Sequence, residues 1–500
     1  MLWGNRRVAG EKADVRVGEA PANPWPRCGV PAAFRPASGR LFDQIAQFIL
    51  SLSKVEIMSP WRSRMPFLLV LLFSLAALSL AACGGGEPTA IVIEVEKVVE
   101  RTVEVEKQVI VVATPTPAAP AGPPIKVGVL YGLSSIAAVY TQGAVKGHNL
   151  AVSEINAAGG VLGRPMELAV RETHLSPTVA LRETQSLVLE EDVDFLMGTI
   201  SSGVAQAVSE FAKENEIIFI DSLAQSSSTT ADLGHRYVFR SSTDTVISGR
   251  AVATVMAERP ETRYVTIGPD YAFGHDAVND FMGKLQELKP EVEVVAELWP
   301  PMLNPDFTPF ITAILEEKPD AVYASMWGGD QINFIKQAIP FGFFDETTLV
   351  TYNMDLDILK AVGAEMPEGI VAGSGFPWYS LDTPAAQRFT RDYFNATGEQ
   401  PMIGALQGYN ATYFLAEAIE KAGTTETEAV ADALEDLTID TPTGRATIRA
   451  FDHQADPMIW VGSSTQSEEY PFPILTDLVP VSGSDVILSI AEVEARRAGK

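Results

Sequence analysis

The chain has 500 residues, 46% of them hydrophobic and 20% charged, and a formal net charge of -27. This length and apolar content predict more than one domain, each with a packed core. Lys and Arg number 37 against 64 Asp and Glu, and no basic run is interleaved with aromatic residues, which argues against nucleic acid as a partner.

An export signal is expected at residues 58–82. Arginines at 62 and 64 precede an apolar run from Met65 to Leu80, which at roughly 16 residues is shorter than the ~20 that a membrane-spanning helix requires. The run ends in Leu80-Ala81-Ala82-Cys83, which resembles a bacterial lipobox. We therefore expect a mature protein that begins at Cys83 and carries lipid there, and a transmembrane anchor is the alternative.

Residues 1–57 match no part of a signal and are rich in Arg, Pro and Gly. We expect translation to begin at Met58 or Met65, which would make this stretch a non-native extension and remove Cys28. The chain has 2 cysteines, Cys28 and Cys83, so we expect neither a disulfide nor a Cys-x-x-Cys metal site.

Residues 83–124 are expected to form a tether. A block from Ile91 to Val112 is rich in Val, Glu and Lys and contains the related sequences IEVEK and VEVEK, and a stretch rich in Pro, Ala and Gly follows it. Alternation within the block favours a strand, whereas Val and Ile at spacings of four and three favour a coiled coil, and the pattern leaves both open. The Pro-rich stretch is expected to be extended and semi-rigid.

From Ile125 onward, short runs rich in Val and Ile alternate with amphipathic helical stretches. Short strands with helical crossovers predict parallel sheets covered on both faces, which is a doubly wound α/β architecture. The expected strands are 126–130, 166–170, 195–198, 217–220, 264–267, 292–296, 321–324, 349–352 and 370–372.

Two interruptions of this rhythm predict two lobes joined by crossing segments. The first is the extended polar run 236–245, and the second lies at residues 373–378. A ligand cleft is expected between the lobes, outside the carboxyl ends of the strands. The expected parts are residues 125–243 (lobe 1, first part), 244–372 (lobe 2, first part), 373–450 (lobe 1, second part), 451–480 (closing segment of lobe 2) and 481–500 (C-terminal tail).

The stretch 194–215 is central to the expected site. A buried strand breaks at Gly198, Ser201 and Ser202 follow, and apolar residues then recur at helical spacing. Ser202 is therefore expected to be the N-cap of a helix, where unpaired N–H groups would suit a small anion such as a carboxylate. The alternative is an ordinary cap that binds nothing.

No motif of a known catalytic site occurs: the sequence contains no GxSxG, GxxxxGK[ST], GxGxxG or HExxH, and its 5 histidines have no metal-ligand spacing. We therefore expect neither an enzyme nor a metal or cofactor site. Polar and aromatic residues at the ends of predicted strands instead suit a zwitterionic amino acid or small amide, although each aromatic residue could equally be part of the core. The candidates are Tyr140, Ser201, Ser202, Ala224, Ser226, Tyr271, Phe273, Trp327 and Asp355.

From about Ile125 to Gly462 the chain resembles the extracytoplasmic solute-binding proteins of ABC transporters, in particular the branched-chain amino-acid binding type, which are type I periplasmic binding proteins. The resemblance rests on an ordered set of short motifs: Ile125-Lys126-Val127-Gly128, residues 155–163 (INAAGGVLG), residues 198–202 (GTISS), residues 270–274 (DYAFG), residues 328–330 (GGD) and residues 441–444 (TPTG).

The resemblance implies roles for polar residues. Ser202 matches the serine that holds the ligand carboxylate through its hydroxyl and backbone N–H, and Ala224 lies near the second carboxylate-binding loop. Asp355 is the nearest match to the acid that binds the ligand ammonium, although the alignment there requires a gap.

The resemblance also implies aromatic contacts. Tyr140 and Trp327 match positions where aromatic residues are common, and Phe273 stands where the family often has a tyrosine. Two further residues depart from the family pattern, because Asp221 and Gln225 replace small residues and a threonine. The ligand is therefore not fixed as leucine, isoleucine or valine.

The expected function is that of a monomeric, lipid-anchored, extracytoplasmic binding protein. It would capture an amino acid or amide by hinged closure of two lobes and deliver it to an ABC transporter permease. The alternative is a sensor on the same fold that reports ligand occupancy to a signalling partner.

Overall fold

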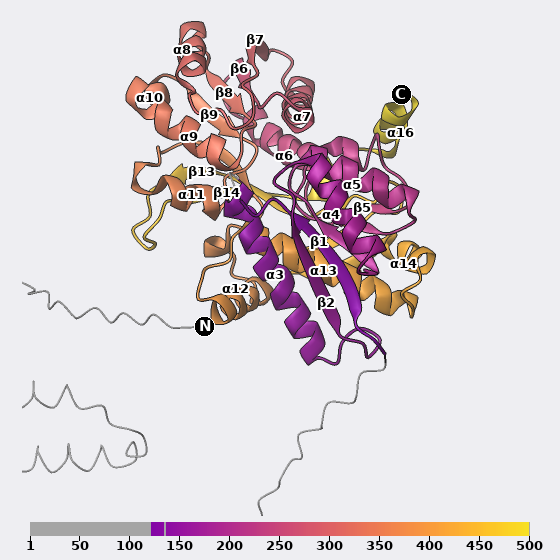
Figure 1. The fold of residues 1–500 in the computed structure, drawn as a ribbon. Coiled ribbons are helices and arrows are strands. Elements are labelled where there is room, and N and C mark those ends of the chain that lie inside the picture. The colour runs from indigo at the N-terminus through magenta and orange to yellow at the C-terminus, as the bar shows by residue number, and fades with distance from the viewer. Residues whose placement is uncertain (1–121, 135–136, 500) are drawn as a thin grey trace, which may run out of the picture. The chain divides into compact units, whose positions relative to one another are not determined.

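The computed structural model describes residues 122–134 and 137–499 (Figure 1). The expected signal, the lipidation site at Cys83 and the segment 91–112 lie outside these residues. Among the residues that the structure describes, no helix is long and apolar enough to cross a membrane.

The first sheet is entirely parallel and has the strand order β2-β1-β3-β4-β5. Its central strands β1 and β3 are buried apart from the half-buried Lys126, which explains why they read as nearly continuous apolar runs. We call this sheet and its helices lobe 1. Its strands are β1 (Ile125–Tyr131), β2 (Met166–Glu172), β3 (Phe195–Gly198), β4 (Phe219–Asp221) and β5 (Val238–Arg240).

The helices of lobe 1 include a pair, α3 and α13, that pack along each other although they are far apart in sequence (Figure 1). Glycines permit this approach, because a Cβ atom on Gly147 would lie 2.0 Å from Ala405 O and one on Gly404 would lie 2.0 Å from Tyr140 O. The helices are α3 (Ala138–Ala157), α4 (Pro177–Leu189), α5 (Ser202–Glu214), α12 (Pro384–Thr397), α13 (Ile403–Ala422) and α14 (Thr427–Leu434), with the 3-10 turns η2 (Ser227–Thr229) and η5 (Trp378–Ser380).

The second sheet, which with its helices forms lobe 2, has the order β14-β13-β10-β9-β8-β6-β7. Its strands are β6 (Arg263–Ile267), β7 (Glu293–Leu298), β8 (Ala321–Ala324), β9 (Thr348–Thr351), β10 (Val371–Ser374), β13 (Ile459–Thr465) and β14 (Ile474–Val481). Its helices are α6 (Thr245–Ala257), α7 (Ala272–Leu288), α8 (Thr308–Glu317), α9 (Gly328–Ala338), α10 (Phe343–Glu346) and α11 (Leu356–Val362), with η3 (Ile339–Phe341) and η4 (Gly363–Glu365).

Every strand expected from the sequence is present, and its limits shift by at most a few residues. The doubly wound parallel architecture expected from the sequence is confirmed, and lobe 2 adds an antiparallel edge, because β13 pairs antiparallel with both β10 and β14. These strands form a hairpin edge that no helical crossover interrupts, and antiparallel neighbours need none. The sequence analysis also missed β5, this hairpin, and a separate hairpin of β11 (Leu437–Thr441) and β12 (Gly444–Ile448).

The chain passes between the sheets at three places: after β5, after β10 and before β13. The first and third passages pair with each other, since Arg240 N–H donates to His453 O (2.9 Å) and Ala455 N–H donates to Arg240 O (2.9 Å). Gln454 Nε2 adds a bond to Ser242 O (2.7 Å). The residue limits that we gave for the parts of the lobes remain a prediction.

Arg240 is fully buried at this junction. Its Nη2 lies 3.1 Å from Oδ2 of the equally buried Asp221 and donates to Ser226 O (2.9 Å), while Nη1 donates to Gln454 Oε1 (3.1 Å). Burial raises the pKa of Asp221 to about 6, and the Arg240 charge opposes that rise. The guanidinium thereby joins β4, the loop after it and the third crossing passage.

Lobe 1 also touches α7 of lobe 2 through Asp280, whose Oδ2 accepts from Ser227 Oγ (3.2 Å) and from Thr245 Oγ1 (2.6 Å). Burial raises the pKa of Asp280 to about 7, the largest effect, while the Thr245 hydroxyl lowers it. A carboxyl group in this contact is therefore partly protonated near neutral pH.

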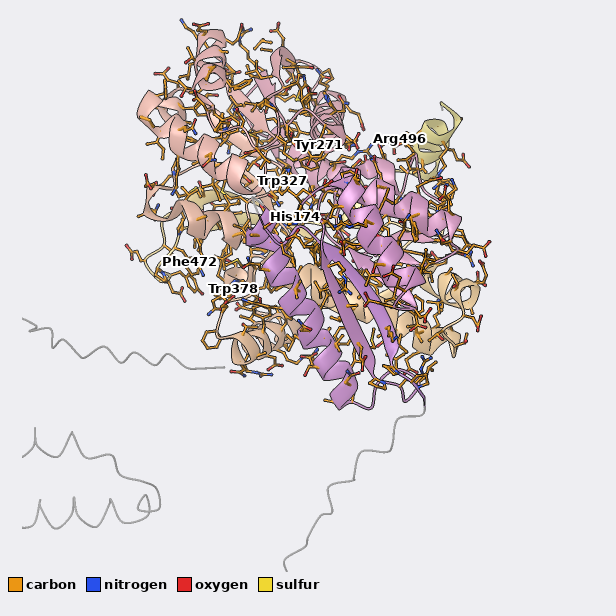
Figure 2. The ribbon with its side chains drawn as sticks, viewed as in Figure 1. His174, Tyr271, Trp327, Trp378, Phe472 and Arg496 are labelled. Atoms are coloured by element: carbon orange, nitrogen blue, oxygen red, sulfur yellow. The ribbon has the colours of Figure 1, made fainter. Side chains whose placement is uncertain are left out.

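The expected C-terminal tail is folded. It contains α15 (Gly483–Val486) and α16 (Ile490–Ala498). Ser489 and Glu492 form a capping box at the N-terminus of α16. Glu492 Oε1 pairs with Arg250 Nη2 of α6 (2.5 Å), and Arg496 Nη2 pairs with Asp232 Oδ2 in lobe 1 (2.9 Å). Figure 2 shows Arg496 on α16 beside the body of the protein.

We predict that Arg240→Met lowers the free energy of unfolding by about 3 to 5 kcal/mol, because it leaves the Asp221 carboxylate buried without its counter-charge. Urea unfolding measures the change. Arg182→Met, at a side chain that is 71% exposed, is the control and should change stability by no more than about 0.5 kcal/mol. Equal effects of the two substitutions would contradict a structural role for the buried pair.

A second prediction concerns Asp280. Its folded pKa of about 7 lies above the value of about 3.9 for an unfolded chain, so its contribution to stability is complete below the unfolded pKa and is lost as pH rises through the folded pKa. Asp280→Asn removes this titration. The unfolding free energy of the wild type relative to the variant should therefore fall between pH values of about 4 and about 7 and level off above them, and parallel pH profiles would refute the assignment.

Candidate ligand-binding site

A cavity of about 630 Å³, part of it open to solvent, lies between the lobes. Tyr140 of lobe 1 and Tyr271, Phe273, Trp327 and Asp355 of lobe 2 line it, so these candidates from the sequence meet at one place. Figure 2 shows Tyr271 and Trp327 near each other at the boundary between the lobes.

Two tyrosine hydroxyls are positioned by N–H groups of lobe 2. Trp327 Nε1 donates to Tyr271 OH (3.0 Å), and Gly328 N–H donates to Tyr140 OH (3.2 Å). Burial raises the pKa of both tyrosines, so their hydroxyls stay protonated. Since each oxygen already accepts a hydrogen bond, each retains its own O–H to donate to a ligand.

Aromatic rings form a continuous wall of the cavity. Phe273 contacts Tyr271 at a centroid distance of 5.8 Å and Tyr352 at 5.3 Å, the latter edge to face, while Tyr140 and Trp327 lie 6.4 Å apart across the lobes. The wall can cover an apolar or aromatic part of a ligand while the hydroxyls remain available to its polar part.

Asp355 is the acidic residue of the cavity lining. It precedes α11, it is 2% exposed, and its Oδ1 accepts from Ser374 Oγ (2.5 Å), Gly375 N–H (3.0 Å) and Phe376 N–H (3.2 Å). Burial raises its pKa to about 6, and these donors oppose the rise. The carboxyl group is thus mostly ionised at pH 7 and held in one orientation.

Amide side chains are the main feature that the sequence analysis missed. Gln225, Asn353 and Gln407 line the cavity, and within the described part of the chain their Oε1, Oδ1 and Oε1 atoms are buried without a hydrogen-bond partner. Gln225 departs from the family pattern, and Asn353 lies two residues before Asp355. Neither feature of the sequence indicates that the side chain faces the cavity. The remaining lining residues not anticipated are Ile200, Leu223, Ser242, Thr243, Ser248, Tyr352, Gly375, Ile403 and Ile459.

The expected helix cap at Ser202 is wrong. Gly198 and Thr199 both have positive φ (114° and 65°), so the chain turns sharply after β3, and the N-cap is Ser201, one residue earlier than expected, without a side-chain capping bond. Ser202 is the first helical residue, and its Oγ accepts from Ser226 N–H (3.2 Å).

The other candidates from these two loops also make internal contacts. Ala224 N–H donates to Asp221 Oδ1 (3.0 Å), and Ser226 Oγ donates to an oxygen of Asp276 on α7. Ser201, Ser202, Ala224 and Ser226 are not among the residues that line the cavity, whereas their neighbours Ile200, Leu223 and Gln225 are. Their roles in ligand binding stay predictions.

Within the described residues, no group of three or more His, Cys, Asp or Glu side chains could hold a metal ion. The cavity can therefore offer hydroxyl donors, amide groups, one carboxylate and aromatic faces. This set can orient a small polar molecule.

A family model described as periplasmic binding protein matches residues 124–468. The Leu/Ile/Val-binding protein homolog 4 of Brucella melitensis is 24% identical over 351 residues, covering 68% of this chain and 80% of the relative. The leucine-, isoleucine-, valine-, threonine-, and alanine-binding protein of Pseudomonas aeruginosa is 24% identical over 309 residues, covering 61% and 80%.

Solved structures have the same fold. An ABC transporter substrate-binding protein from Sphaerobacter thermophilus has a TM-score of 0.64 and 26% identity, covering 72% of this chain and 98% of that one. A solute-binding protein from Rhodopseudomonas palustris in complex with benzoate has a TM-score of 0.65 and 24% identity, covering 72% and 97%. The resemblance drawn from the sequence motifs is thus confirmed, and the chain belongs to the periplasmic binding protein family.

Proposed function

We propose that this protein is the extracytoplasmic ligand-capturing component of an ABC importer, and that its ligand is a small zwitterion, such as an amino acid, or a neutral amide. The observation that carries the proposal is the composition of the cavity between the lobes. It combines one buried acid with hydroxyl and amide groups, and among the described residues that line it none is Lys, Arg or His.

This composition bears on the charge of the ligand. A purely anionic ligand would be buried beside Asp355 without a counter-charge, and an uncompensated buried charge is strongly unfavourable. A zwitterion can place its ammonium at Asp355 and its carboxylate at the hydroxyls of Tyr140 and Tyr271. A neutral amide can use the same hydroxyls and the amide groups of Gln225 and Asn353.

The contacts between lobes support capture by closure. Lobe 2 reaches lobe 1 through Gly328 N–H, which donates to Tyr140 OH, and through Asp280 Oδ2, which accepts from Ser227 Oγ. Because the lining residues come from both lobes, a ligand makes its full set of contacts only in the closed form, which is the differential affinity that closure requires. The names of the curated relatives, which include binding proteins for leucine, isoleucine and valine, agree with an amino acid.

We further propose that lipid on Cys83 anchors the protein outside the cytoplasm and that an ABC permease receives the ligand. The apolar run that ends in Leu80-Ala81-Ala82-Cys83 supports the anchor. The solved neighbours named as ABC transporter proteins support the permease as a partner.

The ligand class can be tested by thermal shift with amino acids, neutral amides and benzoates. A ligand at 100 times its dissociation constant should stabilise the protein by about 2.7 kcal/mol. We expect amino acids or amides to raise the melting temperature more than benzoates do. Stabilisation by benzoates alone would contradict the proposed charge preference.

Asp355→Asn separates the two ligand types. For a zwitterion, calorimetric titration should show a loss of about 2 to 5 kcal/mol of binding free energy, because the ligand ammonium loses its buried partner. A neutral amide should bind almost unchanged. Asp330→Asn is a matched control, because Asp330 is a buried acid of lobe 2 that is not in the cavity lining, and it should leave affinity within about two-fold.

Cys83→Ser tests the anchor. The variant lacks the thiol that would carry lipid. Stable membrane anchoring requires more than one lipid signal, so a protein without lipid at this position should leave the membrane fraction. Immunoblotting of cell fractions measures this. Mass spectrometry of the wild type should find the protein beginning at a modified Cys83. An intact segment 65–82 on that protein would overturn the anchor.

A further inference from the structure

A second groove lies beside the main cavity, between α3 and the connection from α12 to α13 in lobe 1 and α11 of lobe 2. It has a volume of about 800 Å³, part of it open to solvent, and it shares no lining residue with the main cavity. Its residues come from the first turns of α3, from α11, from Tyr393 of α12 and from the connection that ends at Met402.

The groove contains oxygen acceptors that lack partners. Asp357 is 3% exposed and lines the groove, and among the described residues neither of its carboxylate oxygens has a hydrogen-bond partner. Gln400 Oε1, on the same groove, is also buried and unpartnered. Buried polar atoms are nearly always paired in folded proteins, so three such oxygens at one groove require donors from elsewhere.

The nearest groups of the protein do not meet this need. Burial, the largest effect, and the neighbouring Asp355 raise the pKa of Asp357 well above its usual range, although the backbone N–H groups of Asp357 and Ile403 and the Lys360 charge act in the opposite direction. The Lys146 ammonium is paired with Glu399 at 2.6 Å. By hydrogen-bond geometry, the carboxyl oxygens therefore have no partner among the described residues.

Lys360, three residues after Asp357, is the alternative partner. Its ammonium lies instead over the ring of Phe472, 5.9 Å from the centroid, in a neighbouring pocket that also includes Trp378. Figure 2 shows Trp378 and Phe472 close to each other on this side of the protein, and their centroids are 6.4 Å apart. Lys360 also lines the groove and its charge lowers the pKa of Asp357, but its ammonium forms no ion pair with this acid in the described part of the chain.

We propose that this groove is a second binding site, for a primary alkylammonium group, in which Asp357 supplies the charge and Gln400 a further acceptor. An ammonium group has three N–H donors and one positive charge, which match the unpartnered oxygens. The site lies between the lobes and is separate from the cavity at Asp355. It does not depend on the ligand or the transport role proposed above.

The test is calorimetric titration of the full chain with n-butylammonium chloride at constant ionic strength. Tetramethylammonium is the matched probe, because it has the same charge but no N–H donor. We expect binding of n-butylammonium, binding of tetramethylammonium at least about ten-fold weaker, and a loss of at least about ten-fold in Asp357→Asn, as expected when the charged acceptor is removed. Glu365→Gln makes the same charge change on an exposed residue outside the groove and should stay within about two-fold.

Thermal unfolding without added amine separates a binding role from a structural one. Asp357→Asn should keep or raise the melting temperature, because it replaces a buried acid whose oxygens have no hydrogen-bond partner among the described residues. No binding of n-butylammonium by the wild type, unchanged binding in Asp357→Asn, or loss of binding in Asp355→Asn instead would each overturn the proposal. So would equal destabilisation by Asp357→Asn and Lys360→Met, which would identify the lysine as the structural partner of the acid.

Discussion

The arrangement of the site depends on one buried guanidinium. Arg240 ends β5, where the chain leaves lobe 1, and its side chain joins Asp221 at the end of β4 to Gln454 on the third crossing passage. Its bond to Ser226 O also fixes the loop that carries Leu223 and Gln225 to the cavity. The passages between the lobes and the loop that lines the cavity are therefore held by the same charge. A buried ion pair suits this role because its geometry is specific even where its net contribution to stability is small.

The polar lining of the cavity bears on the closure proposed above. Gln225, Asn353 and Gln407 each present a buried oxygen that has no partner in the described part of the chain. An unpaired buried acceptor costs about 1 to 3 kcal/mol, so under this proposal closure without a ligand would either leave these groups unpaired or hydrate them in a confined space. An open form would expose them to bulk water. A ligand with suitable donors would remove this penalty only in a closed form, and the same groups would thus provide both selectivity and free energy for closure.

The sequence was most informative where a pattern repeats. Alternation of buried strands with amphipathic helices predicts the parallel strands other than β5, because burial on two faces demands it. It misses β5, which is three residues long and lies within a polar segment, and the β13–β14 hairpin, which has no helical crossover. Tyr140, Tyr271, Phe273, Trp327 and Asp355 could be anticipated because they follow strand ends, where the topology places clefts. The amide side chains that face the cavity could not be anticipated, because the conformation of a turn decides whether Ala224 or Gln225 faces it. For the same reason, the expected N-cap of α5, Ser202, is one residue later than the observed N-cap, Ser201.

Asp355 and Asp357 show how little sequence distance separates opposite environments. Asp355 precedes α11, where its carboxylate oxygen accepts from one hydroxyl and two N–H groups and lines the main cavity. Asp357 is the second residue of the same helix, and residues two apart on a helix do not share a face, so its carboxylate turns to the neighbouring groove and toward lobe 1. One acid is satisfied by its own lobe, and the other has oxygens that no described group satisfies. The burial of an unpaired carboxylate is unfavourable for stability, so its presence at the contact between the lobes is more readily explained by a function in binding than by a function in folding.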